Sequence, residues 1–229
     1  MEPASHDDCI VIVIDDDPDV REGIRALLQS VRLQSKAYAS APEFFRSKPS
    51  NQTSCLILDV RLPGLSGLDF QAKLANACIK IPIVFITGHG DIGMSVKAMK
   101  AGAVEFLIKP VREQDLLDAV RTALDRDRKR RECEDKNDDL RSRYNALSQR
   151  QREVMTLAAT GLMNKQIAAE IGIAEVTVKV HRHNIMKKLG AKSFAELVRM
   201  ADILGPPHAK EDLAESRIQL SSQWASSLT

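Results

Sequence analysis

The chain contains 229 residues, which is enough for one or two domains that each bury a core. Hydrophobic residues make up 44% and charged residues 28%, as in soluble globular proteins. The longest apolar runs span about five residues, whereas a membrane helix needs roughly 20, so a membrane protein is excluded. The start MEPASHDD lacks the apolar core of an export signal, and four scattered cysteines fit reduced thiols. We therefore expect a cytoplasmic location.

Charge divides the chain into two parts of opposite sign. Residues 1–125 contain 14 Lys and Arg against 17 Asp and Glu, a net charge of −3, whereas the remainder contains 19 against 14, a net charge of +5. A basic second half beside an acidic first half suggests a nucleic-acid partner for the second half. Ordinary variation in surface charge explains the difference equally well, so the motifs must decide between the two.

The first half alternates short apolar runs with amphipathic stretches. Four runs are rich in Val and Ile, as strands buried on both faces require, and they span 10–14, 55–58, 83–86 and 104–108; a weaker run spans 35–39. The amphipathic stretches span 20–31, 68–77, 92–101 and 114–124. Asp17 before Pro18 marks the first helix start, and Gly102 follows the helix over 92–101. The alternation predicts an α/β fold with a doubly wound parallel sheet over 9–125.

The composition changes after the last of these helices. Residues 126–146 are almost all charged, which favours a solvated helical linker; a basic run that contacts DNA is the alternative, weakened by interleaved acids. Residues 147–204 show four helix-like segments and no strand pattern, with capping boxes at Ser148 with Gln151 and Ser193 with Glu196. We expect an all-α domain there and a mobile, Ser-rich tail over 205–229, with a short helix over 213–220 as the alternative.

Acidic and basic side chains follow several of the predicted strands. Asp15 and Asp16 follow the first run, Asp59 the third, Thr87 the fourth and Lys109 the fifth. The carboxyl ends of parallel strands meet at one sheet edge, so these residues should lie together. Clustered carboxylates need a cation, and oxygen ligands suit Mg²⁺. A carboxylate can also attack phosphorus while a lysine and a hydroxyl stabilise the phosphoryl oxygens. Taken singly, each residue has an ordinary structural explanation; only the shared edge favours chemistry.

The first half resembles a known family. The segments IDDDPDVR, LILDVRLPGLSG, VFITGHGD and AMKAGAVEFLIKP are similar, in this order, to the receiver domain of two-component response regulators, particularly those of the NarL/FixJ family. The resemblance implies strand order 2-1-3-4-5, a cis bond before Pro110 and Asp59 as the phosphoacceptor. It further implies a Mg²⁺ site whose ligands are Asp16, Asp59 and the backbone carbonyl of Arg61, with Asp15 acting through water. It also implies that Thr87 and Lys109 contact the phosphoryl group and that Phe106 is an aromatic switch.

The second half contains a helix-turn-helix pattern. Residues 164–171 and 175–189 are helix-like and are separated by the short turn Gly172-Ile173-Ala174. One face of the second helix is apolar, and another carries Val176, Lys179, Val180, His183 and Lys187. Lysine attracts phosphate or guanine acceptors and valine can touch a thymine methyl, so this face suits a DNA groove. A solvated basic face is the alternative from the residues alone.

The wider pattern favours DNA binding. The segment from LSQRQREVMTLAATGL to SFAELVRMA resembles the LuxR-type four-helix DNA-binding domain. The resemblance implies that 175–189 is the recognition helix. It implies that three of its residues face the bases: Lys179, Val180 and His183. It also implies that four residues approach phosphates: Thr177, Lys165, Arg182 and Lys187. Met163 and Ala174 depart from the family, which often has a capping Ser or Thr there; an alanine N-cap costs about 1 kcal/mol.

These resemblances together imply a response regulator. A sensor histidine kinase would phosphorylate Asp59, and the homodimer so formed would bind double-stranded promoter DNA and regulate transcription with RNA polymerase. Its enzymatic activity would be limited to Mg²⁺-dependent autophosphorylation. A haloacid-dehalogenase-like phosphatase would need Thr or Val in place of Asp19 and a second aspartate in place of Arg61. An interaction adaptor without DNA binding is disfavoured by the complete helix-turn-helix pattern.

Overall fold

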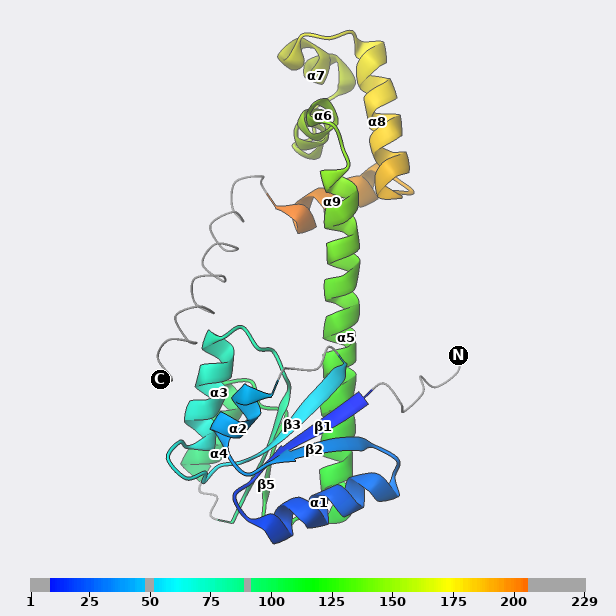
Figure 1. Cartoon of the computed structure of the whole chain (residues 1–229). Helices are drawn as coiled ribbons and strands as arrows, with labels where there is room; N and C mark the ends of the chain where they lie inside the picture. The colour runs from blue at the N-terminus through cyan, green and yellow to red at the C-terminus, as the bar shows by residue number, and fades with distance from the viewer. Residues whose placement is uncertain (1–8, 48–51, 89–91, 206–229) are drawn as a thin grey trace. The chain divides into compact units, whose positions relative to one another are not determined.

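The chain folds into two compact units, Met1–Arg131 and Glu132–Thr229. A computed structural model describes residues 9–47, 52–88 and 92–205 (Figure 1). Apart from Gly205, the predicted tail and its alternative helix over 213–220 lie outside the described residues. Within the described residues, none of the helices combines the length and apolarity needed to cross a membrane.

The first unit is built on one five-stranded parallel sheet. Its strands are β1 (Cys9–Ile14), β2 (Gln34–Tyr38), β3 (Thr53–Asp59), β4 (Ile83–Thr87) and β5 (Glu105–Ile108), in the order β2-β1-β3-β4-β5. The predicted fold class and strand order are confirmed. The three inner strands are almost entirely buried, whereas β2 and β5 lie at the edges and are partly exposed. The edge position of β2 explains why its apolar run is the weakest.

Helices cover both faces of this sheet. On one face α1 (Pro18–Ser30) and α5 (Glu113–Asn145) enclose one core cluster; on the other α2 (Ala41–Arg46), α3 (Gly67–Asn76) and α4 (Ile92–Lys100) enclose a second (Figure 1). The six-residue α2 was not predicted, because so short a segment shows no helical period. The helix α5 continues without interruption for 33 residues, through the charged segment, which is helical as predicted.

Local signals position the loops at the carboxyl edge of the sheet. Asp17 caps α1 by accepting hydrogen bonds from the N–H groups of Asp19 and Val20, and Pro18 occupies the first helical position. The Lys109–Pro110 peptide bond is cis, as the family resemblance implied. The predicted helix start at Asp17 is therefore correct, and the turns after β1 and β5 are both well defined.

The second unit contains four helices around one core. They are α6 (Gln149–Ala159), α7 (Asn164–Ile171), α8 (Glu175–Leu189) and α9 (Phe194–Leu204). Their core includes Val154, Ile167 and Ile185, and the last turns of α5 add Leu140 and the partly buried Tyr144. The few apolar side chains in the otherwise charged segment are therefore packed, not solvated.

Capping in the second unit follows the sequence only in part. The Ser148–Gln151 capping box is complete at the start of α6. At α9 the Ser193 side chain accepts from the Glu196 N–H, but Glu196 accepts from the N–H of Lys192 rather than of Ser193, so the second box is only half formed. As expected, the N-cap residues of α7 and α8, Met163 and Ala174, provide no side-chain cap.

Candidate functional site

Polar residues converge at the carboxyl edge of the sheet, as its topology predicts. Asp15 follows β1, Asp59 ends β3, Thr87 ends β4 and Lys109 follows β5. One ligand oxygen from each of Asp15, Asp16 and Asp59 lies within 4.8 Å of the other two. This acidic triad is typical of the Mg²⁺ site of receiver domains. Asp16 is exposed to solvent while the other two aspartates are buried.

Asp15 is completely buried and paired. Its Oδ2 atom lies 2.7 Å from Lys109 Nζ, and its Oδ1 atom accepts a hydrogen bond from the Asp17 N–H at 3.0 Å. Arg21 donates to the backbone carbonyls of Asp15 and Asp16, at 2.7 and 2.9 Å. Arg21 thus stabilises the loop that carries Asp15 and Asp16. We did not predict this contact, because a lone arginine on an amphipathic helix gives no sign of it.

Asp59 is 6% exposed and less completely neutralised than Asp15. Its Oδ2 atom lies 3.7 Å from Lys109 Nζ, and Oδ1 accepts from the Arg61 N–H at 3.3 Å. Burial raises the pKa of Asp59 above the ordinary value for aspartate; Lys109 and the Arg61 N–H pull the pKa down, and the charges of Asp15 and Asp16 push it up. The carboxylate is therefore held in a position where added positive charge would stabilise it.

Gly67 fits closely behind Asp59. A Cβ atom at this position would lie 2.4 Å from the carbonyl oxygen of Asp59 and 3.0 Å from the Cα of Val60. The Gly67 N–H donates to the carbonyl of Val60 at 2.8 Å, and Ser66 caps α3. Gly67 belongs to the segment LPGLSG that carries the family resemblance. Its tight packing shows why α3 can start directly against the strand that ends in Asp59.

Two further predicted site residues lie on neighbouring strands. Thr87 is fully buried at the end of β4, pairs in register with Ile108, and its carbonyl accepts from the Lys109 N–H at 2.8 Å. Phe106 on β5 is partly buried, and its ring centroid lies 6.1 Å from that of Phe85. The pairing of β4 with β5 therefore connects Thr87, at the acidic edge, to Phe106 on the outer strand.

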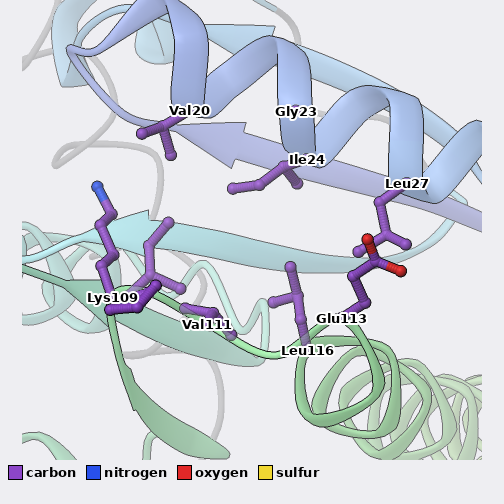
Figure 2. A pocket seen from close by; sticks show the side chains of 10 residues that line it. Val20, Gly23, Ile24, Leu27, Lys109, Val111, Glu113 and Leu116 are labelled. Atoms are coloured by element: carbon purple, nitrogen blue, oxygen red, sulfur yellow. The ribbon is translucent and has the colours of Figure 1, made fainter.

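An apolar groove runs from this site between α1 and the start of α5. Figure 2 shows Val20, Ile24 and Leu27 of α1 facing Val111 and Leu116, with the Lys109 ammonium at one end and the Glu113 carboxylate at the other. Gly23 lies among the α1 residues, and nothing lies within 4 Å of where its Cβ would be. The missing side chain keeps this wall of the groove open.

Exposed apolar side chains gather on α4 and β5. Ile92 is 84% exposed, and Val96, Met99 and Ile108 are each more than 40% exposed. Large apolar residues that stay in solvent on neighbouring elements are typical of an interaction surface.

The predicted DNA face of α8 is largely in solvent. Lys179, Val180, His183 and Lys187 are exposed, as is Lys165 on α7. Lys179 pairs with Glu175 at 3.1 Å on its own helix, an exposed contact of little energetic value. Thr177 is only partly exposed.

Arg182 differs from the other residues predicted on this face. Its Nη1 atom donates to Asn164 Oδ1 at 2.6 Å, and its guanidinium stacks on the Phe194 ring, 4.2 Å from the centroid. Partial burial lowers its pKa, although an arginine stays charged at neutral pH. These contacts tie the middle of α8 to α7 and to the start of α9.

Both units match family models. Residues 11–121 match the response regulator receiver domain, and residues 145–201 match the luxR family of bacterial regulatory proteins. Among curated proteins, Nodulation protein W of Bradyrhizobium diazoefficiens is 56% identical over 86% of each chain. Transcriptional regulatory protein FixJ of Azorhizobium caulinodans is 40% identical over 85% of this chain and 92% of its own.

A solved structure supports the same conclusion. The response regulator StyR is 50% identical, with a TM-score of 0.73 over 84% of this chain and 98% of its own. The expected family, fold and general function are thus confirmed, and phosphorylation of the receiver is the chemistry that the family carries out. The chain belongs to the two-component response regulators that join a receiver domain to a LuxR-family DNA-binding domain and regulate transcription.

Proposed function

We propose that Asp59 is the residue that accepts the phosphoryl group from a sensor histidine kinase. A carboxylate oxygen of Asp59 attacks phosphorus, the P–N bond of the donor phosphohistidine breaks, and the electron pair of that bond stays on the imidazole nitrogen. The proposal is supported most directly by the grouping of Asp59 with Asp15, Asp16 and Lys109 at the carboxyl edge of the sheet.

The same grouping fits a Mg²⁺ ion. Three carboxylates within 4.8 Å supply the hard oxygen donors that this ion prefers, and only one lysine is recorded against them among the described residues. Asp16, Asp59 and the carbonyl of Arg61 would hold the ion, with Asp15 acting through water. When bound, the ion would supply positive charge that neutralises the phosphoryl oxygens. Lys109 and Thr87 would contact the remaining oxygens, Lys109 through its charge and Thr87 through its hydroxyl.

The groove between α1 and α5 is the docking surface we assign to the kinase. It begins at Lys109, 3.7 Å from the Asp59 carboxylate, and its walls are apolar. A helix that carries the phosphohistidine and lays apolar side chains along the groove would bring its phosphoryl group to Asp59. Gly23 leaves room for one of these side chains.

Phosphorylation would then change the α4–β5 face. Thr87 would move toward the phosphoryl oxygen, and Phe106 would turn inward, which reshapes the surface that carries Ile92 and Ile108. We assign this surface to a two-fold homodimer, because its exposed apolar side chains need a partner. Two linked DNA-binding units bind two half-sites more tightly than one unit binds one.

Double-stranded promoter DNA is the partner we assign to α8. Lys179, Val180 and His183 would face base edges. Lys165 and Lys187, whose exposure supports a contact, would approach phosphates, as would the partly exposed Thr177. Arg182 would have to give up its bonds to Asn164 and Phe194 to reach a phosphate, so we place it last among the candidates. RNA polymerase would be the partner at the promoter.

The phosphoacceptor is tested by intact-mass measurement after incubation with Mg²⁺ and acetyl phosphate. The parent chain should gain one phosphoryl group that is lost in base and kept in acid. Asp59→Asn should gain none, whereas Asp118→Asn, an exposed aspartate on α5, should behave like the parent. Undiminished phosphorylation of the Asp59→Asn variant would rule out this assignment.

A further inference from the structure

The C-terminal end of α8 is held by α5. Arg143, in the last turn of α5, donates from Nη1 to the carbonyl oxygen of Leu189, the last residue of α8, at 3.3 Å. The chain passes so close that a Cβ on Gly190 would lie 3.0 Å from the same Nη1 atom. The guanidinium therefore rests against the final turn of α8, where the helix exposes carbonyl groups and carries partial negative charge.

Arg143 is fixed in this position by its own helix. Its Nε and Nη2 atoms bind the two carboxylate oxygens of Asp139, one turn earlier, at 3.1 and 2.6 Å. Such a bidentate pair sets the plane of the guanidinium and directs the remaining nitrogen, Nη1, toward Leu189. A lysine at this position could reach the carbonyl but could not form the two-pronged pair with Asp139.

Two further contacts act at the same end. Lys188 Nζ lies 3.4 Å from the carbonyl oxygen of Ala146 and 3.0 Å from Gln151 Oε1. Leu189 itself is buried in the core that includes Leu140 of α5. The last turn of α8 is thus held by polar and apolar contacts to the end of α5, to Ala146 after it and to the start of α6.

The opposite end of α8 is anchored by the buried side chain of Val178 and lacks a side-chain cap. Its N-cap residue is Ala174, whose side chain cannot accept a hydrogen bond from the first turn. Among the described residues, the side-chain tethers recorded for α8 from other elements act at its middle, through Arg182, and at its C-terminal end. Besides the buried side chains of Val178, Ile185 and Leu189, these two sets of polar contacts hold the exposed face in its orientation.

We propose that Arg143 is a positioning residue for DNA binding, which fixes the C-terminal end of α8 so that its exposed face meets DNA in one orientation. This inference rests on the proposed role of α8 as the recognition helix. Without the tether, the last turn must be ordered when DNA binds, and that ordering reduces the affinity.

The test compares full-length variants for binding to a duplex selected by the parent chain from a random-sequence library. Arg143→Ala should weaken binding about three- to tenfold, the loss typical of one hydrogen bond, and Arg143→Lys should recover part of it. Arg141→Ala is the matched control: its side chain is 46% exposed against 47% for Arg143, and its ion pair with Asp138 lies on α5. It should bind like the parent.

Two readouts separate positioning from other roles. Binding is measured well below the unfolding temperature and over several salt concentrations; a positioning role leaves the salt slope unchanged, whereas a lost phosphate contact reduces it by about one. Amide exchange should speed up in peptides that cover the last turn of α8 only for Arg143→Ala. Unchanged affinity, or a reduced salt slope, overturns the proposal. If Lys179→Ala also leaves affinity unchanged, the assignment of α8 fails instead.

Discussion

Lys109 and Asp15 form the shortest ion pair described at the acidic edge, with Lys109 Nζ 2.7 Å from Asp15 Oδ2. The same ammonium lies 3.7 Å from Asp59 Oδ2. One positive charge is therefore shared unequally by two buried carboxylates, and Asp59 receives the smaller part. This inequality leaves the proposed phosphoacceptor in need of a further cation, and it has consequences for stability as well as for chemistry.

Removing the charge of Asp59 should stabilise the chain when Mg²⁺ is absent. Burial raises the pKa of Asp59 in the folded state above its unfolded value of about 4. The folded state therefore holds this proton more tightly than the unfolded state, and the resulting stability is present at low pH and lost as pH rises through the folded pKa. Asp59→Asn does not titrate there, so it should exceed the parent in free energy of unfolding at pH 7.

The pH profile and Mg²⁺ provide the control. Urea unfolding in EDTA should show the advantage of Asp59→Asn shrinking as the pH falls toward 4. Adding Mg²⁺ should stabilise the parent more than the variant, because the variant has lost one anionic ligand. A variant that is less stable than the parent at pH 7 in EDTA would show that Lys109 already compensates Asp59 in full.

Gly23→Ala should separate stability from kinase recognition. Alanine in a helix interior is favoured over glycine by about 1 kcal/mol, so the free energy of unfolding should rise. The added methyl group enters the open wall of the α1–α5 groove, and one extra methyl in a packed contact costs ~1–3 kcal/mol. We expect phosphotransfer from a histidine kinase that phosphorylates the parent to slow by about tenfold, while the rate with acetyl phosphate stays unchanged.

Equal slowing with both phosphodonors would place the defect in the acidic site rather than in the groove. Unchanged transfer from the kinase, in a variant shown to be more stable than the parent, would exclude this groove as the docking surface. The stability measurement matters here, because it shows that the methyl group was accepted by the helix.

Lys179→Ala should weaken binding to a selected duplex by about 1–3 kcal/mol if Lys179 contacts a base edge. Its side chain is exposed, and its pair with Glu175 is too weak to keep it from DNA. If Lys179 contacts only phosphate, affinity should fall equally for all sequences and the salt slope should drop by about one. Lys136→Ala, an exposed lysine on α5, serves as the control. Identical binding by both variants would show that this face of α8 points away from DNA.

The acidic edge could be predicted because it depends on topology rather than on packing. Once the strands are assigned as parallel, the residues after β1, β3, β4 and β5 must share an edge, and the structure groups Asp15, Asp59 and Lys109 there. This reasoning does not depend on the exact strand boundaries. The prediction of the acidic edge was therefore correct although some predicted strand ends differ from the observed ones by a residue or two.

Contacts between side chains and distant backbone could not be predicted. The close fit of Gly67 against the Asp59 carbonyl, the bonds of Arg21 to two carbonyls and the bond of Arg143 to Leu189 join residues with no periodic relation in the sequence. The charged stretch of α5 was predicted to be helical, but the packing of Leu140 and Tyr144 into the second core was not, because two apolar residues in a charged stretch give no apolar stripe. Its helix is supported by ion pairs three or four residues apart, such as Arg141 with Asp138.

We expect the signal to pass from the phosphate to the α4–β5 face through Thr87 and Phe106. Thr87 is fully buried at the end of β4, while Ile108, its partner in register, is exposed on β5. A hydroxyl drawn toward a phosphoryl oxygen would leave space beside β5, and Phe106 is placed to fill it, since it is only partly buried and lies beside Phe85. Thr87→Ala removes the hydroxyl and so should uncouple the face from the site.

We therefore expect Thr87→Ala to accept a phosphoryl group on Asp59 yet to dimerise at least about tenfold more weakly than the phosphorylated parent, a factor that corresponds to ~1.4 kcal/mol. Thr87→Ser keeps the hydroxyl and is the matched control; it should dimerise nearly as the parent does. Light scattering of the phosphorylated chains, with phosphate content checked by intact mass, measures both quantities. If phosphorylated Thr87→Ala dimerises as well as the parent, the signal reaches the α4–β5 face by another route, and Asp59 keeps its assignment, because phosphorylation and dimerisation are measured separately.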